Sequence, residues 1–302
     1  MLFPAPEMPA FPAAHTTTAV RYPRFEDCAQ DGRLLAIAVP AATHALWENV
    51  LDDHPGTRNS LATGVLPLLT RWTVRSFDQP VRVDRPLTAT MGFELAHERD
   101  AAGAVARLYL NVWAEARGLP GRINVGPPPA LGAGGEPVAA GWVFAEHTFT
   151  RPFAPAGARR VTSLAGIEGY PALPEATYRS QAPASAAALP DGARWLDALA
   201  PDVIATRFTL DQTDGNQHVN SLVYVRLFLD AAQRRLAAGG HPALVRSTEY
   251  DIAFRKPSFA GDTVRAHLRM FAHGDQLGAA GFLAADGEAD KPRCFIRVAY
   301  GA

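Results

Sequence analysis

One helix candidate constrains the fold of this chain more than any other segment. Residues 221–236 place apolar side chains around most of a helix circumference, so the helix must be buried rather than laid on a surface. Strand candidates follow it directly. They span residues 248–254, 263–271, 277–284 and 293–300. A buried helix followed by several strands predicts an antiparallel sheet wrapped around that helix, which is the hotdog arrangement.

The first half of the chain repeats this order of elements. Arg33–Val39 is a strand candidate, and the apolar spacing from Asn59 to Phe77 predicts a buried helix. Further strand candidates span residues 88–95, 105–113 and 141–150. Two strand–helix–strands units predict an internal duplication. The expected fold class is therefore α+β, a tandem or double hotdog whose two sheets join edge to edge and enclose helices near residues 59–76 and 220–238.

Length and composition agree with this organisation. The chain has 302 residues, 48% of them apolar, which is enough for a large core in one or two domains. We expect an amino-terminal hotdog over residues 1–150. Residues 151–302 are expected to contain a linker followed by a carboxyl-terminal hotdog.

Charge and cysteine content narrow the function classes. The formal charge of −1 gives no support for nucleic-acid binding, which normally shows as a basic excess. Cys28 and Cys294 are far apart and fit free thiols in a reducing compartment. The proline-rich amino terminus lacks a basic start and is typical of a loose arm, and no apolar run is long enough to span a membrane. We therefore expect a cytoplasmic protein that binds neither nucleic acid nor membrane.

The residues richest in chemistry lie directly before the second helix. Asp214, Asn216, His218 and Asn220 fall within seven positions. Asp214 can act as a base or as a nucleophile, while Asn216 and His218 can orient water or a carbonyl oxygen. Structural roles compete with these: Asp-Gly is a common turn pair, the histidine and amide can simply hold a loop, and Asn220 is a favoured helix cap.

A helix start can also polarise a carbonyl group through unpaired backbone N–H groups and the helix dipole. The backbone amides of Val219, Asn220 and Ser221 are the candidates here. Asp214, Asn216 and His218 are thus the predicted catalytic residues, and the amides of Val219, Asn220 and Ser221 the predicted substrate-binding groups.

Residues 214–220 and Tyr224 resemble the Asp-x-Asn-x-His-Val-Asn-Asn…Tyr signature of plant-type and bacterial acyl-ACP thioesterases. The stretch from Tyr250 to Asp262 resembles the strand and turn that follow in the broader 4-hydroxybenzoyl-CoA thioesterase superfamily. The resemblance is specific from Phe208 to Val264. It implies a double hotdog that hydrolyses acyl-ACP or acyl-CoA in fatty-acid or polyketide metabolism, with the signature in the carboxyl-terminal half and the acyl pocket shaped by the other half. In single-hotdog relatives the catalytic carboxylate is an aspartate just before the helix, where Asp214 lies.

Two positions depart from the family pattern. Ser221 replaces the second asparagine of the signature, and the stretch from Arg255 to Ser258 lacks the glutamate that the plant enzymes carry there. If Asp214 were not the acid, Glu249 or Asp251 would be the replacement. The loop Asp52–Asn59, which the predicted helix at 59–76 would place before the first helix, does not reproduce the signature.

Other functions fit the sequence less well. A polyketide-type dehydratase would need a His-x-x-x-Gly-x-x-x-x-Pro stretch, and neither His44 nor His54 has the glycine at that spacing. The missing glutamate leaves open a catalytically silent protein that binds acyl thioesters. No Gly-x-Ser-x-Gly elbow is present, and the residues around His54 lack metal-ligand spacing, so we expect no metal and no cofactor.

The expected partner is an acyl carrier protein or a coenzyme A thioester, and the chain would act as a monomeric pseudo-dimer or a homodimer. Carrier proteins are acidic, so paired basic residues are candidate docking charges, although each pair is equally typical of an ordinary solvated surface. The pairs are Arg159-Arg160, Arg234-Arg235 and Arg255-Lys256.

Overall fold

The computed structural model describes residues 2–123, 135–241 and 245–301, and these form one continuous twelve-stranded sheet. Its order is β1-β3-β4-β5-β2-β9-β12-β11-β10-β7, with β6 beside β3 and β8 beside β10. The strands are β1 (Thr16–Arg21), β2 (Leu66–Ser76), β3 (Leu87–Arg99), β4 (Val105–Gly118), β5 (Val138–Thr150), β6 (Ala176–Thr177), β7 (Arg194–Trp195), β8 (Ala200–Arg207), β9 (Arg246–Phe254), β10 (Thr263–His273), β11 (Gln276–Ala285) and β12 (Pro292–Gly301).

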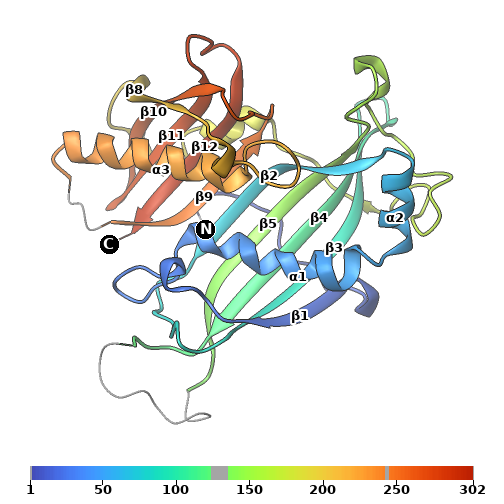
Figure 1. Ribbon diagram of the computed structural model, residues 1–302, viewed down its shortest axis with the longest axis horizontal. Helices are drawn as coiled ribbons and strands as arrows, with labels where there is room; N and C mark the ends of the chain where they lie inside the picture. The colour runs from blue at the N-terminus through green and yellow to red at the C-terminus, as the bar shows by residue number, and fades with distance from the viewer. Residues whose placement is uncertain (1, 124–134, 242–244, 302) are drawn as a thin grey trace.

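Two helical segments lie on the same side of this sheet (Figure 1). The second half carries α3 (Ser221–Ala238). The first half carries a composite helix in which η3 (Ala36–Thr43), α1 (His44–Leu46) and η4 (Trp47–Leu51) follow one another, and then α2 (Pro55–Ala62). Short 3₁₀ turns complete the structure: η1 (Ala13–His15), η2 (Phe25–Asp27), η5 (Ala156–Ala158), η6 (Pro183–Ala187) and η7 (Leu210–Gln212).

The two halves have mirrored strand orders. Moving outward from the centre, the first half runs β2, β5, β4, β3, β1, and the second runs β9, β12, β11, β10, β8. Each half supplies an edge strand, a helix and then four antiparallel strands. The halves join edge to edge where β2 pairs antiparallel with β9, from Arg71 opposite Ala253 to Arg75 opposite Glu249. The expected double hotdog, including its edge-to-edge join, is confirmed.

The predicted elements of the second half are confirmed with small shifts in their bounds, but the first half differs. The predicted helix over 59–76 is wrong: α2 ends at Ala62, and β2 occupies 66–76. The predicted strand over 33–39 is also wrong, because the composite helix begins at Ala36. Residues 52–59 consequently follow the first-half helix rather than precede it.

Local physical chemistry explains both errors. Gly64 has φ of 72°, a left-handed conformation suited to the end of a helix, and Pro67 lacks the N–H that a continuing helix would need. In β2, Trp72 and Val74 face the helices while Arg71 and Thr73 face the other, covered side of the sheet. A strand that is buried on both faces carries apolar residues without strict alternation, and their spacing can then resemble that of a helix.

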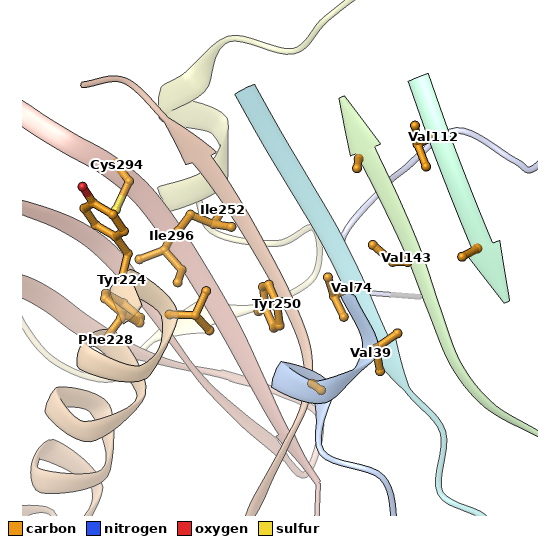
Figure 2. Close-up of a cluster of buried hydrophobic side chains, with 14 of the residues drawn as sticks. Val39, Val74, Val112, Val143, Tyr224, Phe228, Tyr250, Ile252, Cys294 and Ile296 are labelled. Carbon is orange, nitrogen blue, oxygen red and sulfur yellow. The ribbon is translucent and has the colours of Figure 1, made fainter. Parts of the chain in front are cut away.

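A single core fills the space between the sheet and the helices. Figure 2 shows it crossing the join, from Phe228 on α3, past Ile252 and Tyr250 on β9, to Val74 on β2 and Val39 on η3. The halves therefore share one hydrophobic layer, so their relative placement is set by packing as well as by strand pairing.

The opposite face of the join holds a buried ionic cluster. Asp251, with no exposed surface, accepts hydrogen bonds from Arg71 at 2.5 and 2.7 Å, from Arg297 at 3.1 Å and from Thr73 at 3.3 Å. A second nitrogen of Arg297 forms an ion pair with it at 2.9 Å. Ser185 of η6 accepts a further hydrogen bond from Arg71 at 3.0 Å. Arg71 and Thr73 come from the first half and the other two charged residues from the second, so the cluster ties the two halves together.

The amino-terminal arm, expected to be loose, is packed against this face. Phe3 is fully buried, and its ring lies 4.7 Å from the guanidinium of Arg297. The backbone amides of Leu2 and Phe3 donate to the carboxylate of Glu249 at 3.0 and 2.8 Å. Because the arm then runs on to the first half, where Trp113 donates to the carbonyl of Pro6 at 3.1 Å, it spans the join.

Removing the central carboxylate should destabilise the protein strongly. In Asp251→Ala two buried guanidinium groups lose the ion-pair partner that they share, and we expect the free energy of unfolding to fall by about 3–5 kcal/mol. Glu288→Ala, which breaks the exposed pair with Lys291, should cost less than about 1 kcal/mol. Urea unfolding of both variants measures the difference; equal costs would contradict a structural role for the cluster.

A buried histidine should make stability depend on pH. His147 donates through Nδ1 to the carbonyl of Leu110 at 3.2 Å, beneath Trp47, and burial lowers its pKa to about 4. An unfolded chain takes up this proton near pH 6.5, whereas the folded protein resists it. The lowered pKa therefore removes stability as pH falls from about 6.5 to about 4, by about 3 kcal/mol.

The variant His147→Gln keeps hydrogen-bonding capacity but does not titrate. Urea unfolding at several pH values should give a shallower loss of stability for the variant than for the parent across this window. Parallel curves would show that His147 contributes nothing to the pH dependence.

Candidate functional site

The residues before α3 form a compact turn. Thr213 and Val219 are bridged as a short antiparallel pair. Within that pair the amide of Asp214 donates to the carbonyl of His218 at 3.1 Å, and the amide of Gln217 donates to the carbonyl of Asp214 at 2.9 Å. Gln217 has φ of 64°, a left-handed conformation that is uncommon outside glycine and is found disproportionately at functional sites. The turn is therefore closely specified by its own backbone.

Asp214 is half-buried in this turn, and both of its carboxylate oxygens accept hydrogen bonds. The amide of Asn216 donates to Oδ1 at 2.9 Å, and the side-chain amide of Asn220 donates to Oδ2 at 3.1 Å. These two donors fix the orientation of the carboxylate. Since each oxygen can accept more than one bond, Asp214 can still reach a water molecule or a substrate.

The side chains of His218 and Asn216 flank the carboxylate, and only that of His218 is held by a hydrogen bond to the described residues. The ring of His218 is half-buried, and its Nδ1 lies 3.2 Å from the carbonyl of Val219. A carbonyl only accepts, so Nδ1 is the donor, and in this tautomer Nε2 is the acceptor. Asn216 is exposed, and its side-chain amide makes no hydrogen bond within the described part of the chain.

Two of the three proposed carbonyl-binding amides are already used. The amide of Val219 donates to the carbonyl of Ser258 at 2.8 Å, and the amide of Asn220 donates to the carbonyl of Gln212 at 2.9 Å. These bonds join the helix start to the turn after β9 and to η7. Neither amide can serve a substrate carbonyl while they hold.

Among the described residues, the first residue of α3 has an unpaired backbone donor. Asn220 is the N-cap, as expected, and its Oδ1 accepts from the amide of Leu222 at 2.9 Å, while the amide of Val223 donates to the carbonyl of Asn220 at 3.0 Å. The amide of Ser221 has no hydrogen-bond partner among residues 2–123, 135–241 and 245–301. It is therefore the one group of the three positioned to bind a carbonyl oxygen beside a positive helix end.

An aromatic series connects this site to the first half. Tyr224, one turn into α3, packs between Phe208 and Phe254 with ring centroids 5.8 and 6.1 Å away, and Phe254 lies 5.9 Å from Trp72 on β2. Trp72 and Phe254 are only partly buried. The start of α3 thus has an apolar neighbour from the first half.

Other candidate groups lie elsewhere. Asp251 and Glu249 point to the face of β9 opposite Tyr250 and Ile252, where the arginines and the amino-terminal arm occupy them, so neither can replace Asp214. A cavity of about 650 Å³ opens on that side beside Glu249, whose pKa is raised by burial, and none of its lining residues belongs to the motif.

The two histidines weighed for dehydratase chemistry have structural contacts instead. His54 caps α2, since its Nδ1 accepts from the amide of Gly56 at 3.1 Å, and His44 is an exposed partner of Glu48.

Over the described ranges, no group of three or more His, Cys, Asp or Glu residues is arranged to hold a metal ion. Both cysteines are free thiols. In the same part of the chain, no helix is long and apolar enough to cross a membrane.

Comparison with known proteins gives likeness in structure but not in sequence. No protein-family model matches the chain, and no curated protein matches it in sequence. Among solved structures, a protein assigned as an oleoyl thioesterase from Lactobacillus plantarum is 14% identical, with a TM-score of 0.61 over 95% of this chain and 96% of that one.

Two further structures agree over nearly the whole chain. An acyl-ACP thioesterase from Bacteroides thetaiotaomicron is 12% identical, with a TM-score of 0.60 over 95% of this chain and 98% of that one. The 12:0-ACP thioesterase of Umbellularia californica is also 12% identical, with a TM-score of 0.55 over 97% and 99%. The protein therefore has the double-hotdog fold that these three enzymes share.

Proposed function

We propose that this protein hydrolyses an acyl thioester, with its single active site at the start of α3. One observation carries the proposal: the fixed carboxylate of Asp214 lies in the same turn as His218, directly before a helix that begins at Ser221. Within the part of the chain that the structure describes, the Nε2 of His218 and the N–H of Ser221 have no hydrogen-bond partner. A base, an acceptor that orients water, and a carbonyl-oxygen donor are the groups that acyl transfer to water requires. The structural neighbours, named as thioesterases, support the same chemistry.

In the proposed reaction a water oxygen forms a bond to the thioester carbonyl carbon while Asp214 takes the water proton. The carbonyl oxygen gains negative charge and is stabilised by the N–H of Ser221 and the helix dipole. The C–S bond then breaks with its electron pair on sulfur, and the thiolate takes the proton that Asp214 holds, which regenerates the carboxylate. The products are a carboxylic acid and a free thiol. Asn216 and His218 orient the water and the thioester.

The two halves would divide the work. We assign the acyl pocket to residues 1–150 and the catalytic motif to the carboxyl-terminal hotdog within 151–302. The contacts of Trp72 with Phe254, and of Phe254 with Tyr224, support an acyl slot lined by both halves, because they bring apolar groups of the first half to the catalytic turn.

The acyl group would arrive on an acyl carrier protein or on coenzyme A, and we place the reaction in the cytoplasm. Arg234 and Arg235 are paired with Asp202 and Asp197, which weakens them as docking charges. Arg255 and Lys256 are exposed in the turn after β9, whose Ser258 is bonded to the motif, and their side chains make no ion pair to the described residues. This pair supports an anionic carrier, and a panel of acyl-ACP and acyl-CoA substrates distinguishes the two kinds.

Neutralising Asp214 should abolish most of the activity. Asp214→Asn keeps the shape of the side chain but removes the base, so kcat for thioester hydrolysis should fall by roughly two to four orders of magnitude. Asp211→Asn is the matched control, since Asp211 is an exposed carboxylate three residues earlier without a side-chain hydrogen bond to the described residues. Hydrolysis at the parent rate by Asp214→Asn would refute the mechanism. If the parent protein binds acyl thioesters but hydrolyses none, the alternative of a catalytically silent binding protein is established.

The role of the Ser221 amide can be tested by removing only that N–H. Proline is favoured at the first position of a helix, and the preceding Asn220 has φ −59° and ψ 138°, which a following proline tolerates. Ser221→Pro should therefore fold and lower kcat by roughly two to three orders of magnitude. Ser221→Ala keeps the amide and isolates the loss of the hydroxyl. If Ser221→Pro were as active as Ser221→Ala, the carbonyl would be held by another donor.

A further inference from the structure

We propose that Tyr224 is a positioning residue for this site, acting through a hydrogen-bonded link from its hydroxyl through Ser258 to the start of α3. The inference rests on the proposed function and adds a residue that touches neither the substrate nor the reacting atoms. It begins with the hydroxyl of Tyr224, which accepts from the backbone N–H of Ser258 at 2.8 Å.

Ser258 also holds the backbone of the catalytic turn in place. The carbonyl of Ser258 accepts from the N–H of Val219 at 2.8 Å, and Val219 is two residues before Ser221. Tyr224 therefore reaches back along its own helix, through the turn after β9, to the backbone that carries the free amide. Ser258 is fully buried, so no water replaces Tyr224 as the partner of its N–H.

The tyrosine itself is firmly held. Its ring is buried between Phe208 and Phe254 and lies beside Cys294 on β12 (Figure 2). Burial raises the pKa of the Tyr224 hydroxyl, so it stays protonated and does not serve as a base. Its contribution is geometric: it sets where the turn at Ser258, and with it the Ser221 amide, lies relative to Asp214.

The structure offers a matched control for deleting this hydroxyl. Tyr250, on β9, is also fully buried in the shared core, but its hydroxyl has no hydrogen-bond partner among the described residues. Tyr224→Phe and Tyr250→Phe thus remove the same atom from the same core. Only the first variant leaves a buried N–H unpaired.

We expect Tyr224→Phe to lower kcat roughly 10- to 100-fold, because small misplacements of catalytic groups have effects of this size. KM should change little, since the acyl and carrier contacts remain. Tyr250→Phe should retain the parent kcat. Hydrogen exchange of the Val219 and Ser258 amides, followed by NMR, should be faster in Tyr224→Phe and unchanged in Tyr250→Phe.

The outcomes separate positioning from general stability. A parent-like kcat in Tyr224→Phe overturns the proposal. So does a loss of kcat in both variants that follows the decrease in their unfolding midpoints. If the parent hydrolyses no thioester, the proposed function fails. Amide exchange alone then tests whether Tyr224 holds the start of α3 through Ser258. Faster exchange at Val219 only in Tyr224→Phe then upholds it, and unchanged exchange overturns it.

Discussion

The pairing of β2 with β9, and the buried Asp251 between Arg71 and Arg297, is the interaction on which the rest of the structure depends. Burying three charged groups is costly unless each has a partner, and Arg71 meets Asp251 only when the two sheets abut in one register. A shift of one residue would turn Arg71 toward the apolar core. The join therefore fixes where the aromatic groups of the first half stand relative to the start of α3.

The sequence predicts the second half well because its signals are local. The helix from Ser221 to Ala238 has a long apolar run and begins at a good cap, and the strands after it are separated by polar turns. The first half misleads because its helix contains Pro40 and changes from 3₁₀ to α to π geometry, which no simple period describes. The strand after it is covered on both faces, by the core on one side and by η6 and charged partners on the other.

The same distinction between local and distant signals holds at the site. Asp214, Asn216, His218 and Asn220 are neighbours in sequence, so a motif can bring them to attention, and the cap role of Asn220 follows from its position. Their partners cannot be found that way: the carbonyls that occupy two of the helix-start amides come from η7 and from the turn after β9. Glu249 and Asp251 illustrate the opposite failure: both lie within β9, in the stretch that resembles the family, but their side chains point to the face away from α3.

The charges at the join also bear on how a tandem chain differs from a symmetric pair of single hotdogs. The first half contributes an arginine there, and the second contributes one aspartate and one arginine. A join built from two copies of the first half would lose Asp251 and Arg297 and would leave Glu146, which lies opposite Arg71 on β5, as the buried acid beside each arginine. Two copies of the second half would double its aspartate and arginine while losing Arg71 and Thr73. Covalent fusion of the halves thus permits an asymmetric interface, in which the first half supplies Arg71 and Thr73 and the second supplies Asp251 and Arg297.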